Sequence, residues 1–152
     1  MNPEIARFNM IEQQIRPWDV LDQDVLDLLS VVKREAFVPA AYRSLAFTDM
    51  EIPLLVDGRR CGETMLAPKV EARLLQALLP RRHEQVAEVG AGSGYMAALL
   101  AHRARQVVTV ERIAPLADFA RANLRQAGID NVTVETADGA RPEALFGDQR
   151  FD

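Results

Sequence analysis

The sequence has 152 residues, of which 49% are hydrophobic and 26% are charged, and its formal net charge is -4. A chain of this length can bury a substantial apolar core, so we expect one structural unit. The negative net charge excludes a protein that is held to nucleic acid by overall electrostatic attraction.

The residue types that bind metals or form disulfides are scarce. Cys61 is the single cysteine, so no internal disulfide can form, and a reducing compartment is favoured. His83 and His102 are the two histidines, and we predict no metal site from them. No segment reaches the ~20 consecutive apolar residues of a membrane span, and the first ten residues lack the pattern of a signal peptide. We therefore expect a soluble cytoplasmic protein with no membrane or nucleic-acid partner.

Two helices are predicted at the start of the chain. In the first, apolar side chains recur at helical spacing at Ile5, Phe8, Ile11 and Ile15. Asp22 can cap the second helix by accepting hydrogen bonds from its first turn. That helix carries one apolar side, formed by Val25, Leu28, Leu29 and Val32.

A segment without a clear period separates these helices from a third. Residues 46–64 read AFTDMEIPLLVDGRRCGET and are interrupted by Pro53 and Gly58, so we expect an ordered loop. Pro68 suits the first turn of a helix, and Pro80 marks its end. The predicted apolar stripe of this helix consists of Val70, Leu74, Leu75 and Leu78.

The pattern changes in the second half of the chain. Short runs of β-branched residues at 86–89, 107–110 and 132–134 alternate with helical stretches at 95–102 and 115–127. A βαβαβ order of this kind predicts an α/β fold with a parallel sheet and crossover helices.

The loop after the first predicted strand is rich in glycine. The stretch EVGAGSGY (88–95) places Gly90, Gly92 and Gly94 at alternate positions between a strand and a helix. This position lies at the carboxyl edge of a parallel sheet, where open α/β sheets bind their ligands. A glycine turn that merely lets the helix pack close to the strand is the alternative.

The spacing of the glycines narrows the choice of ligand. A dinucleotide fingerprint reads G-x-G-x-x-G, and a phosphate-binding Walker loop needs a Lys followed by Ser or Thr; this chain has neither. An acidic residue followed by G-x-G-x-G is used to bind S-adenosylmethionine, and Glu88 fits the acidic position. An NAD-dependent oxidoreductase is the less favoured reading.

Two further carboxylates follow the next two strands. Glu111 ends the stretch VVTVE, where a carboxylate can accept hydrogen bonds from both hydroxyls of a ribose. Asp138 and Gly139 follow the third strand, where a carboxylate or the backbone can meet the amine of an adenine. Polar groups at three neighbouring strand ends resemble the nucleoside site of class I methyltransferases.

Four segments make the resemblance more specific: MIEQQIRPWDVLD (10–22), VKREAFVPAAYRSLAFTDMEIPL (32–54), GETMLAP (62–68) and VAEVGAGSGYMAALLA (86–101). From about residue 9 onward the chain resembles the protein-L-isoaspartate O-methyltransferase family. The resemblance implies a Rossmann-like fold with an added N-terminal helical region and the cofactor S-adenosyl-L-methionine. It also implies an enzyme that methylates the carboxylate of isoaspartyl residues in damaged proteins and peptides. Its cofactor contacts would fall on Glu88, Gly90, Gly92, Glu111, Asp138 and Gly139, with Gly94 completing the loop.

One departure from the family pattern concerns catalysis. The family usually reads Thr-Ile-Ser where this chain reads Thr64-Met65-Leu66, and the serine hydroxyl is the family's active-site group. Leu66 occupies the serine position, and Thr64 is the nearest retained hydroxyl. The alternative function is therefore an S-adenosylmethionine-binding family member whose methyl transfer is lost or retargeted.

The resemblance also suggests an organisation of the chain. We expect an N-terminal helical region with a substrate-side loop at 1–80, followed by a partial S-adenosylmethionine-binding domain at 81–152. The last residues, QRFD (149–152), resemble the start of the family's fourth strand, and the later C-terminal strands are missing. A truncated chain would leave the first strand with an open edge, through which self-association is possible.

Overall fold

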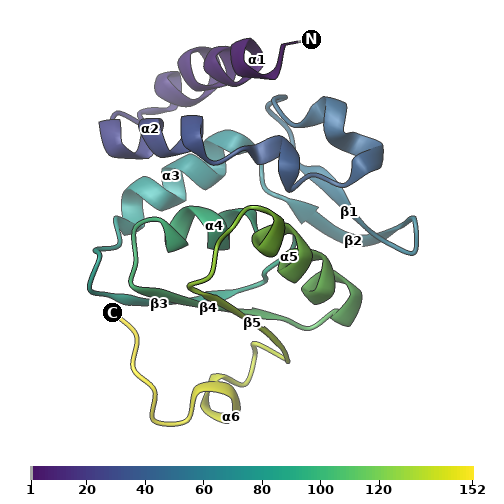
Figure 1. The fold of residues 1–152 in the computed structure, drawn as a ribbon, viewed down its shortest axis with the longest axis vertical. Coiled ribbons are helices and arrows are strands. Elements are labelled where there is room, and N and C mark those ends of the chain that lie inside the picture. Colours follow the sequence, from purple (N-terminus) through teal and green to yellow (C-terminus); the bar gives the residue numbers. More distant parts are fainter. Residues whose placement is uncertain (1) are drawn as a thin grey trace.

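The computed structural model describes residues 2–152 and contains an α/β core with helices packed above it (Figure 1). The helices are α1 (Pro3–Met10), α2 (Gln23–Val31), α3 (Pro68–Leu78), α4 (Tyr95–Ala101), α5 (Ala114–Gln126) and α6 (Pro142–Phe146). The strands are β1 (Ile52–Val56), β2 (Arg59–Met65), β3 (Gln85–Val89), β4 (Gln106–Glu111) and β5 (Val132–Thr136). Shorter helical segments lie at Ile11–Ile15, Arg16–Trp18, Arg34–Ala36 and Ala40–Leu45.

The central sheet has the strand order β3-β4-β5, and both pairs are parallel. Helices α4 and α5 lie on one face of this sheet, and the C-terminal segment with α6 lies beyond the other face (Figure 1). The predicted βαβαβ order is confirmed. All three strands therefore end at the same edge of the sheet, which places the loops that follow them side by side.

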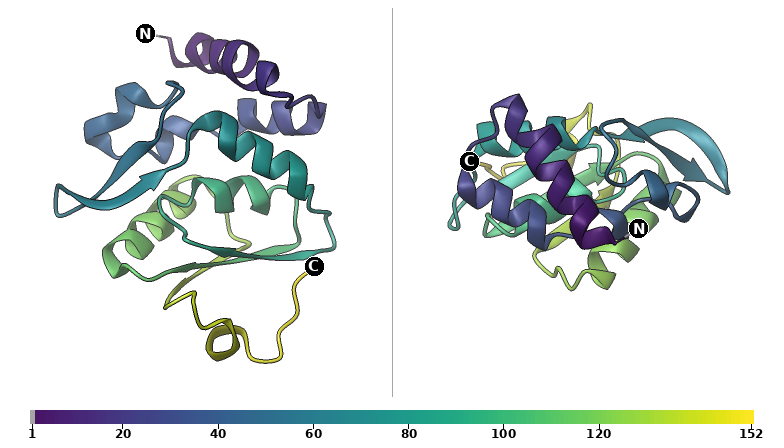
Figure 2. Two further views of the ribbon diagram at one scale, coloured as in Figure 1. Left: turned by 180° about the vertical axis from the view of Figure 1, so that it is seen from behind. Right: turned by 90° about the horizontal axis from the view of Figure 1, so that it is seen from above.

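Residues 46–64 contain a β-hairpin, so the expectation of a loop was wrong. Strands β1 and β2 pair antiparallel, and the hairpin extends to one side of the helices (Figure 2). Asp57 and Gly58 form its turn with φ of 50° and 74°, as an Asp-Gly hairpin turn requires. The register shifts between Pro53 and Leu55, because proline has no N–H to donate to the ladder.

Helix formation at the N-terminus was predicted correctly, but part of the expected burial was not. Ile11 and Ile15 are buried, whereas Ile5 is exposed and Phe8 is 63% exposed. α1 lies at the outer end of the molecule, and its buried residues are Arg7 and Met10. Asp22 caps α2 as predicted, since its Oδ1 accepts the Val25 N–H at 3.0 Å.

Helix α3 begins at Pro68 as predicted and ends before Leu79, whose φ is 40°. Its expected stripe is not the buried face: Val70, Leu74 and Leu78 are 36%, 50% and 55% exposed, and Leu75 alone of the four is buried. The side that packs inward carries Pro68, Glu71, Ala72 and Leu75. We call Val70, Leu74 and Leu78 the α3 apolar stripe.

One apolar core runs through both halves of the described chain. It joins Ile15 and Leu29 from the N-terminal helices to Leu75 of α3 and to Leu99 and Leu116 around the sheet. The division at residue 80 between an N-terminal helical region and a cofactor-binding domain therefore stays a prediction. In the part of the chain that the structure describes, no helix has the length and apolarity needed to cross a membrane.

The last residue lies beside the first strand of the sheet. The Asp152 N–H donates to the Gln85 carbonyl at 3.1 Å, and the Gln85 N–H donates to Asp152 Oδ2 at 3.0 Å. These bonds lie on the side of β3 that faces away from β4, where the family resemblance places a fourth strand.

Candidate active site

The glycine loop is tied to the end of the neighbouring strand. The N–H groups of Gly90 and Ala91 both donate to the Val110 carbonyl, at 2.7 and 3.1 Å. The Gly92 N–H donates to Glu111 Oε2 at 3.0 Å. Gly90 and Gly92 have φ of 94° and 54°, a left-handed conformation that side chains disfavour. The loop is therefore held in place by β4 before any ligand binds.

A cavity of about 240 Å³ lies on one side of this loop. Its wall comes from the end of β2, from α3, from the end of β3 and from the start of α4. The lining residues that carry chemistry are Thr64, Leu66, Glu71, Glu88 and Tyr95. This cavity therefore brings together Glu88 and both candidates for the acceptor side.

A second cavity of about 190 Å³ lies at the carboxyl ends of β4 and β5. Glu63 from the hairpin lines it together with Glu111, Arg112, Asp138 and Gly139. Both cavities include Val89 and Gly90 in their walls. The two cavities are therefore neighbours at the first glycine of the loop.

Glu111 is buried and already accepts two backbone hydrogen bonds. Its Oε2 accepts from Gly92, and its Oε1 accepts from the Ile113 N–H at 3.0 Å. A carboxylate oxygen can accept more than one hydrogen bond, so each oxygen retains capacity for a ligand hydroxyl. Glu111 thus holds the glycine loop and still has acceptor capacity in the wall of the second cavity.

Glu88 lies opposite Thr109 on the neighbouring strand and is partly buried. Its Oε2 accepts the Thr109 hydroxyl at 2.5 Å. Burial raises the pKa of Glu88 to about 7, the bond from Thr109 lowers it, and the Glu111 carboxylate raises it further. With this pKa, the Glu88 carboxyl exchanges its proton near neutral pH.

Two glycines of the predicted site, Gly94 and Gly139, are restricted by packing. A methyl group on Gly94 would lie 3.3 Å from the Ala120 carbonyl of α5, and Gly94 lines neither cavity. A methyl group on Gly139 would overlap Cγ1 of Val89. Gly139 nevertheless lines the second cavity beside Asp138, whose Oδ1 accepts the Ala140 N–H at 3.0 Å.

The acceptor side of the first cavity departs from the family pattern in its chemistry. Leu66 is 36% exposed and presents an apolar side chain to the cavity. The Thr64 hydroxyl donates to Glu51 Oε2 at 3.1 Å, so its hydrogen is already committed to a neighbouring side chain. Neither residue, as it stands, offers a free hydroxyl donor.

Sequence reasoning missed two charged residues beneath this wall. Glu71 lines the cavity and forms a buried ion pair with Arg34. Burial raises the pKa of Glu71, and the Arg34 guanidinium partly offsets that effect. Arg34 lies in the short helix Arg34–Ala36 between α2 and β1. A charged residue in such a segment is ordinarily predicted to lie on the surface. One signal could have indicated that Glu71 is buried: it lies four residues before Leu75, and so on the same side of α3.

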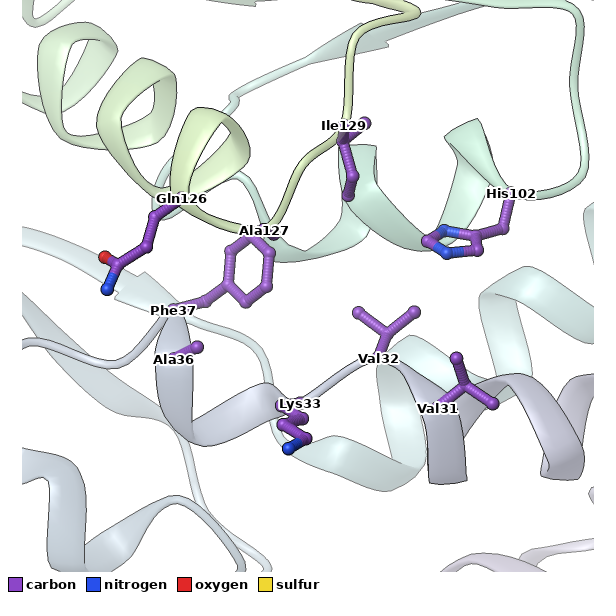
Figure 3. A pocket seen from close by; sticks show the side chains of 9 residues that line it. All are labelled: Val31, Val32, Lys33, Ala36, Phe37, His102, Gln126, Ala127 and Ile129. Atoms are coloured by element: carbon purple, nitrogen blue, oxygen red, sulfur yellow. The ribbon is translucent and has the colours of Figure 1, made fainter.

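Another cavity, of about 400 Å³, lies away from the glycine loop between the ends of α2, α4 and α5 (Figure 3). Phe37 and Ile129 point into it, whereas the polar ends of Lys33 and Gln126 point outward. Its polar groups do not converge on a common point. Among the described residues, no group of three or more His, Cys, Asp or Glu side chains is placed to hold a metal ion.

Comparison with known proteins identifies the family. A sequence profile described as protein-L-isoaspartate(D-aspartate) O-methyltransferase matches residues 6–144. The chain belongs to this family. A protein-L-isoaspartate O-methyltransferase of Herpetosiphon aurantiacus is 40% identical over 134 residues, which cover 88% of this chain and 58% of the relative. Protein-L-isoaspartate O-methyltransferase 1 of Rhodopseudomonas palustris is 44% identical over 135 residues, which cover 89% of this chain and 53% of the relative.

Solved structures show the same fold. A protein-L-isoaspartate O-methyltransferase with 25% identity has a TM-score of 0.75 over 88% of this chain and 42% of its own. A Plasmodium falciparum protein described as a putative member of the family, in complex with S-adenosyl-L-homocysteine, is 19% identical with a TM-score of 0.71 over 95% of this chain and 69% of its own. The Rossmann-like class I methyltransferase fold is thus confirmed. The chain spans little more than half the length of the curated relatives described above.

Proposed function

We propose that this protein binds S-adenosyl-L-methionine and transfers its methyl group to the carboxylate of isoaspartyl residues in proteins or peptides. The observation that carries the proposal is the pair of adjoining cavities at the strand ends, with Glu88 in one and Glu111 in the other. Family membership supports the choice of reaction.

The residues present suit the proposed cofactor. Glu111 would accept the ribose hydroxyls, Asp138 and Gly139 would meet the adenine, and Glu88 with Gly90 would meet the methionine part. A methyl group on Gly90 would touch no atom within 4 Å, so the space above this glycine is open to a ligand. The cofactor carries a sulfonium cation, and carboxylates in both cavities provide a complementary negative charge.

The proposed reaction requires little proton transfer by side chains of the protein. Bound S-adenosyl-L-methionine supplies an activated methyl group, and an acceptor carboxylate with a pKa of ~3.5 is already ionised at neutral pH. The residues around the first cavity therefore have to align the two reactants, which can lower a barrier by ~7–11 kcal/mol. Leu66 offers no hydrogen bond to the acceptor, and a bond of ~1.5–3 kcal/mol corresponds to roughly a 10- to 150-fold change in rate.

A methyl-transfer assay tests the proposal directly. The 152-residue protein is incubated with labelled S-adenosyl-L-methionine and an isoaspartyl peptide, and the matched aspartyl peptide serves as the control. We expect slow transfer to the isoaspartyl peptide and none to the control. Equal labelling of both peptides, or none of either, would reject isoaspartate methylation.

A second candidate function is cofactor binding without methyl transfer, and the apolar side chain of Leu66 in the cavity wall is the observation that favours it. Calorimetric titration distinguishes it from an oxidoreductase: both methyltransferase hypotheses require S-adenosylhomocysteine to bind and NAD not to bind. Binding of S-adenosylhomocysteine together with no transfer to either peptide would select this second function.

The proposed partners and compartment are inferred from the first cavity, the net charge and the cysteine content. Isoaspartyl-containing proteins would be the substrates, because the first cavity is open toward the exposed Thr64 and Leu66. The net charge of -4 speaks against nucleic acid as a partner. A single cysteine, Cys61, favours the cytoplasm.

A further inference from the structure

Arg34 is completely buried and uses all three of its guanidinium nitrogens. Its Nε donates to the Ala46 carbonyl at 2.9 Å, its Nη1 to Glu71 Oε2, and its Nη2 to the Leu66 carbonyl at 2.8 Å. A planar guanidinium with donors in a fixed fork fixes the relative positions of the groups that it binds. These groups come from three separate segments of the chain.

The same guanidinium also contacts the helix that follows the glycine loop. Its central carbon lies 5.2 Å from the ring centroid of Tyr95, the first residue of α4. Tyr95 directly follows Gly94 in the sequence. Arg34 therefore lies between the main chain at Leu66 and the helix that carries the glycine loop, although it lines neither of the two site cavities.

The Leu66 main chain joins two elements, β2 and α3, that both line the first cavity. Met65 ends β2 and Pro68 begins α3, so Leu66 lies in a two-residue connection. Its side chain and that of Thr64 line the first cavity. A shift of this connection would move the acceptor wall relative to the glycine loop.

We propose that Arg34 is a positioning residue that fixes the main chain at Leu66 against the glycine-loop helix and so sets the distance between the acceptor wall and the cofactor. Its effect on methyl transfer rests on the proposed function above. Its effect on the Leu66 connection does not, and the two effects can be measured separately.

Hydrogen exchange of the Leu66 connection is the first measurement. Arg34→Lys keeps the charge but cannot bind three acceptors in the guanidinium geometry. We expect amides in residues 63–68 to exchange about tenfold faster, as the loss of one hydrogen bond to a charged group predicts. Arg121→Lys is the matched control, because Arg121 also donates from its guanidinium to a main-chain carbonyl, that of Val134, and lines neither site cavity. Exchange in residues 63–68 should be unchanged in the control.

A second variant covers the case in which Arg34→Lys fails to fold. Replacing both partners, as Arg34→Met with Glu71→Leu, removes the buried charges together, a change that proteins often tolerate. It also removes the bond to the Leu66 carbonyl, so exchange should again rise in residues 63–68. Unchanged exchange in this segment in every folded variant would overturn the proposal.

Kinetics give the functional readout. In Arg34→Lys, kcat for the isoaspartyl peptide should fall about tenfold, while the dissociation constant for S-adenosylhomocysteine changes by less than about twofold. An equal loss of cofactor affinity would indicate a general structural role and overturn the positioning assignment. If the native protein transfers no methyl group, the proposed function fails, and the exchange measurement still decides the role of Arg34.

Discussion

The carboxylate of Glu111 accepts the N–H of Gly92 at 3.0 Å, so the acid at the end of β4 holds the glycine loop that follows β3. One residue thereby shapes the loop and, in the proposed function, also binds the ribose. Its removal should therefore cost more than one ligand contact.

Glu111→Ala should weaken S-adenosylhomocysteine binding by ~2–3 kcal/mol, because two ribose hydroxyls lose a charged acceptor and the loop loses its tie to β4. Calorimetric titration measures this loss. Glu135→Ala is a suitable control, since Glu135 is an exposed glutamate on the neighbouring strand and lines neither cavity. An affinity equal to that of the native protein would remove Glu111 from the ribose site.

Replacing Glu88 should change how stability depends on pH. Burial raises the pKa of Glu88 from 4.5 to about 7, so between these values the folded protein retains a proton that the unfolded chain has lost. Stability should therefore fall as the pH rises through this window. Glu88→Gln should match the native protein near pH ~4 and exceed its stability near pH ~8 by at most about 3 kcal/mol.

Urea unfolding at the two pH values tests this expectation, with Glu135→Gln as the exposed control. The pKa of the Glu71 carboxyl is raised mainly by burial and least by the Glu88 charge, so replacing Glu88 changes the contribution of Glu71 only slightly. A stability difference that does not vary with pH would show that Glu88 is ionised throughout.

Restoring the family hydroxyl should raise activity. Leu66→Ser should increase methyl transfer to an isoaspartyl peptide by roughly 10- to 150-fold, the value of one charge-assisted hydrogen bond, without changing cofactor affinity. Leu78→Ser makes the same change on the α3 apolar stripe and lines neither cavity, so it should leave the rate unchanged. Rapid transfer by the native protein, or no gain from serine, would show that Leu66 does not limit turnover.

The sheet could be predicted from the sequence because its signals are local. The strands at 86–89 and 107–110 are short β-branched runs, and parallel strand ends necessarily meet at one edge. The placement of Glu88 and Glu111 in adjoining cavities follows from that geometry. The hairpin of β1 and β2 was missed because Pro53 obscured its alternation, although Asp57-Gly58 is a recognisable turn signal.

Burial was harder to predict than secondary structure. The spacing on α3 correctly predicted a helix, yet the side that packs inward carries Glu71 instead of the α3 apolar stripe. A buried glutamate requires a cationic partner, and Arg34 is 37 residues away in the sequence. Spacing within one helix contains no information about such a distant partner.

The close contact between Gly139 and Val89 implies that these two positions cannot vary independently. A methyl group at 139 would overlap Cγ1 of Val89, so Gly139→Ala should destabilise the fold, and Val89→Ala in the same molecule should recover much of the loss. A double-mutant cycle measured by thermal unfolding would give their coupling energy. In evolutionary terms, a side chain at 139, beside the proposed adenine site, is expected to accompany a smaller side chain at 89.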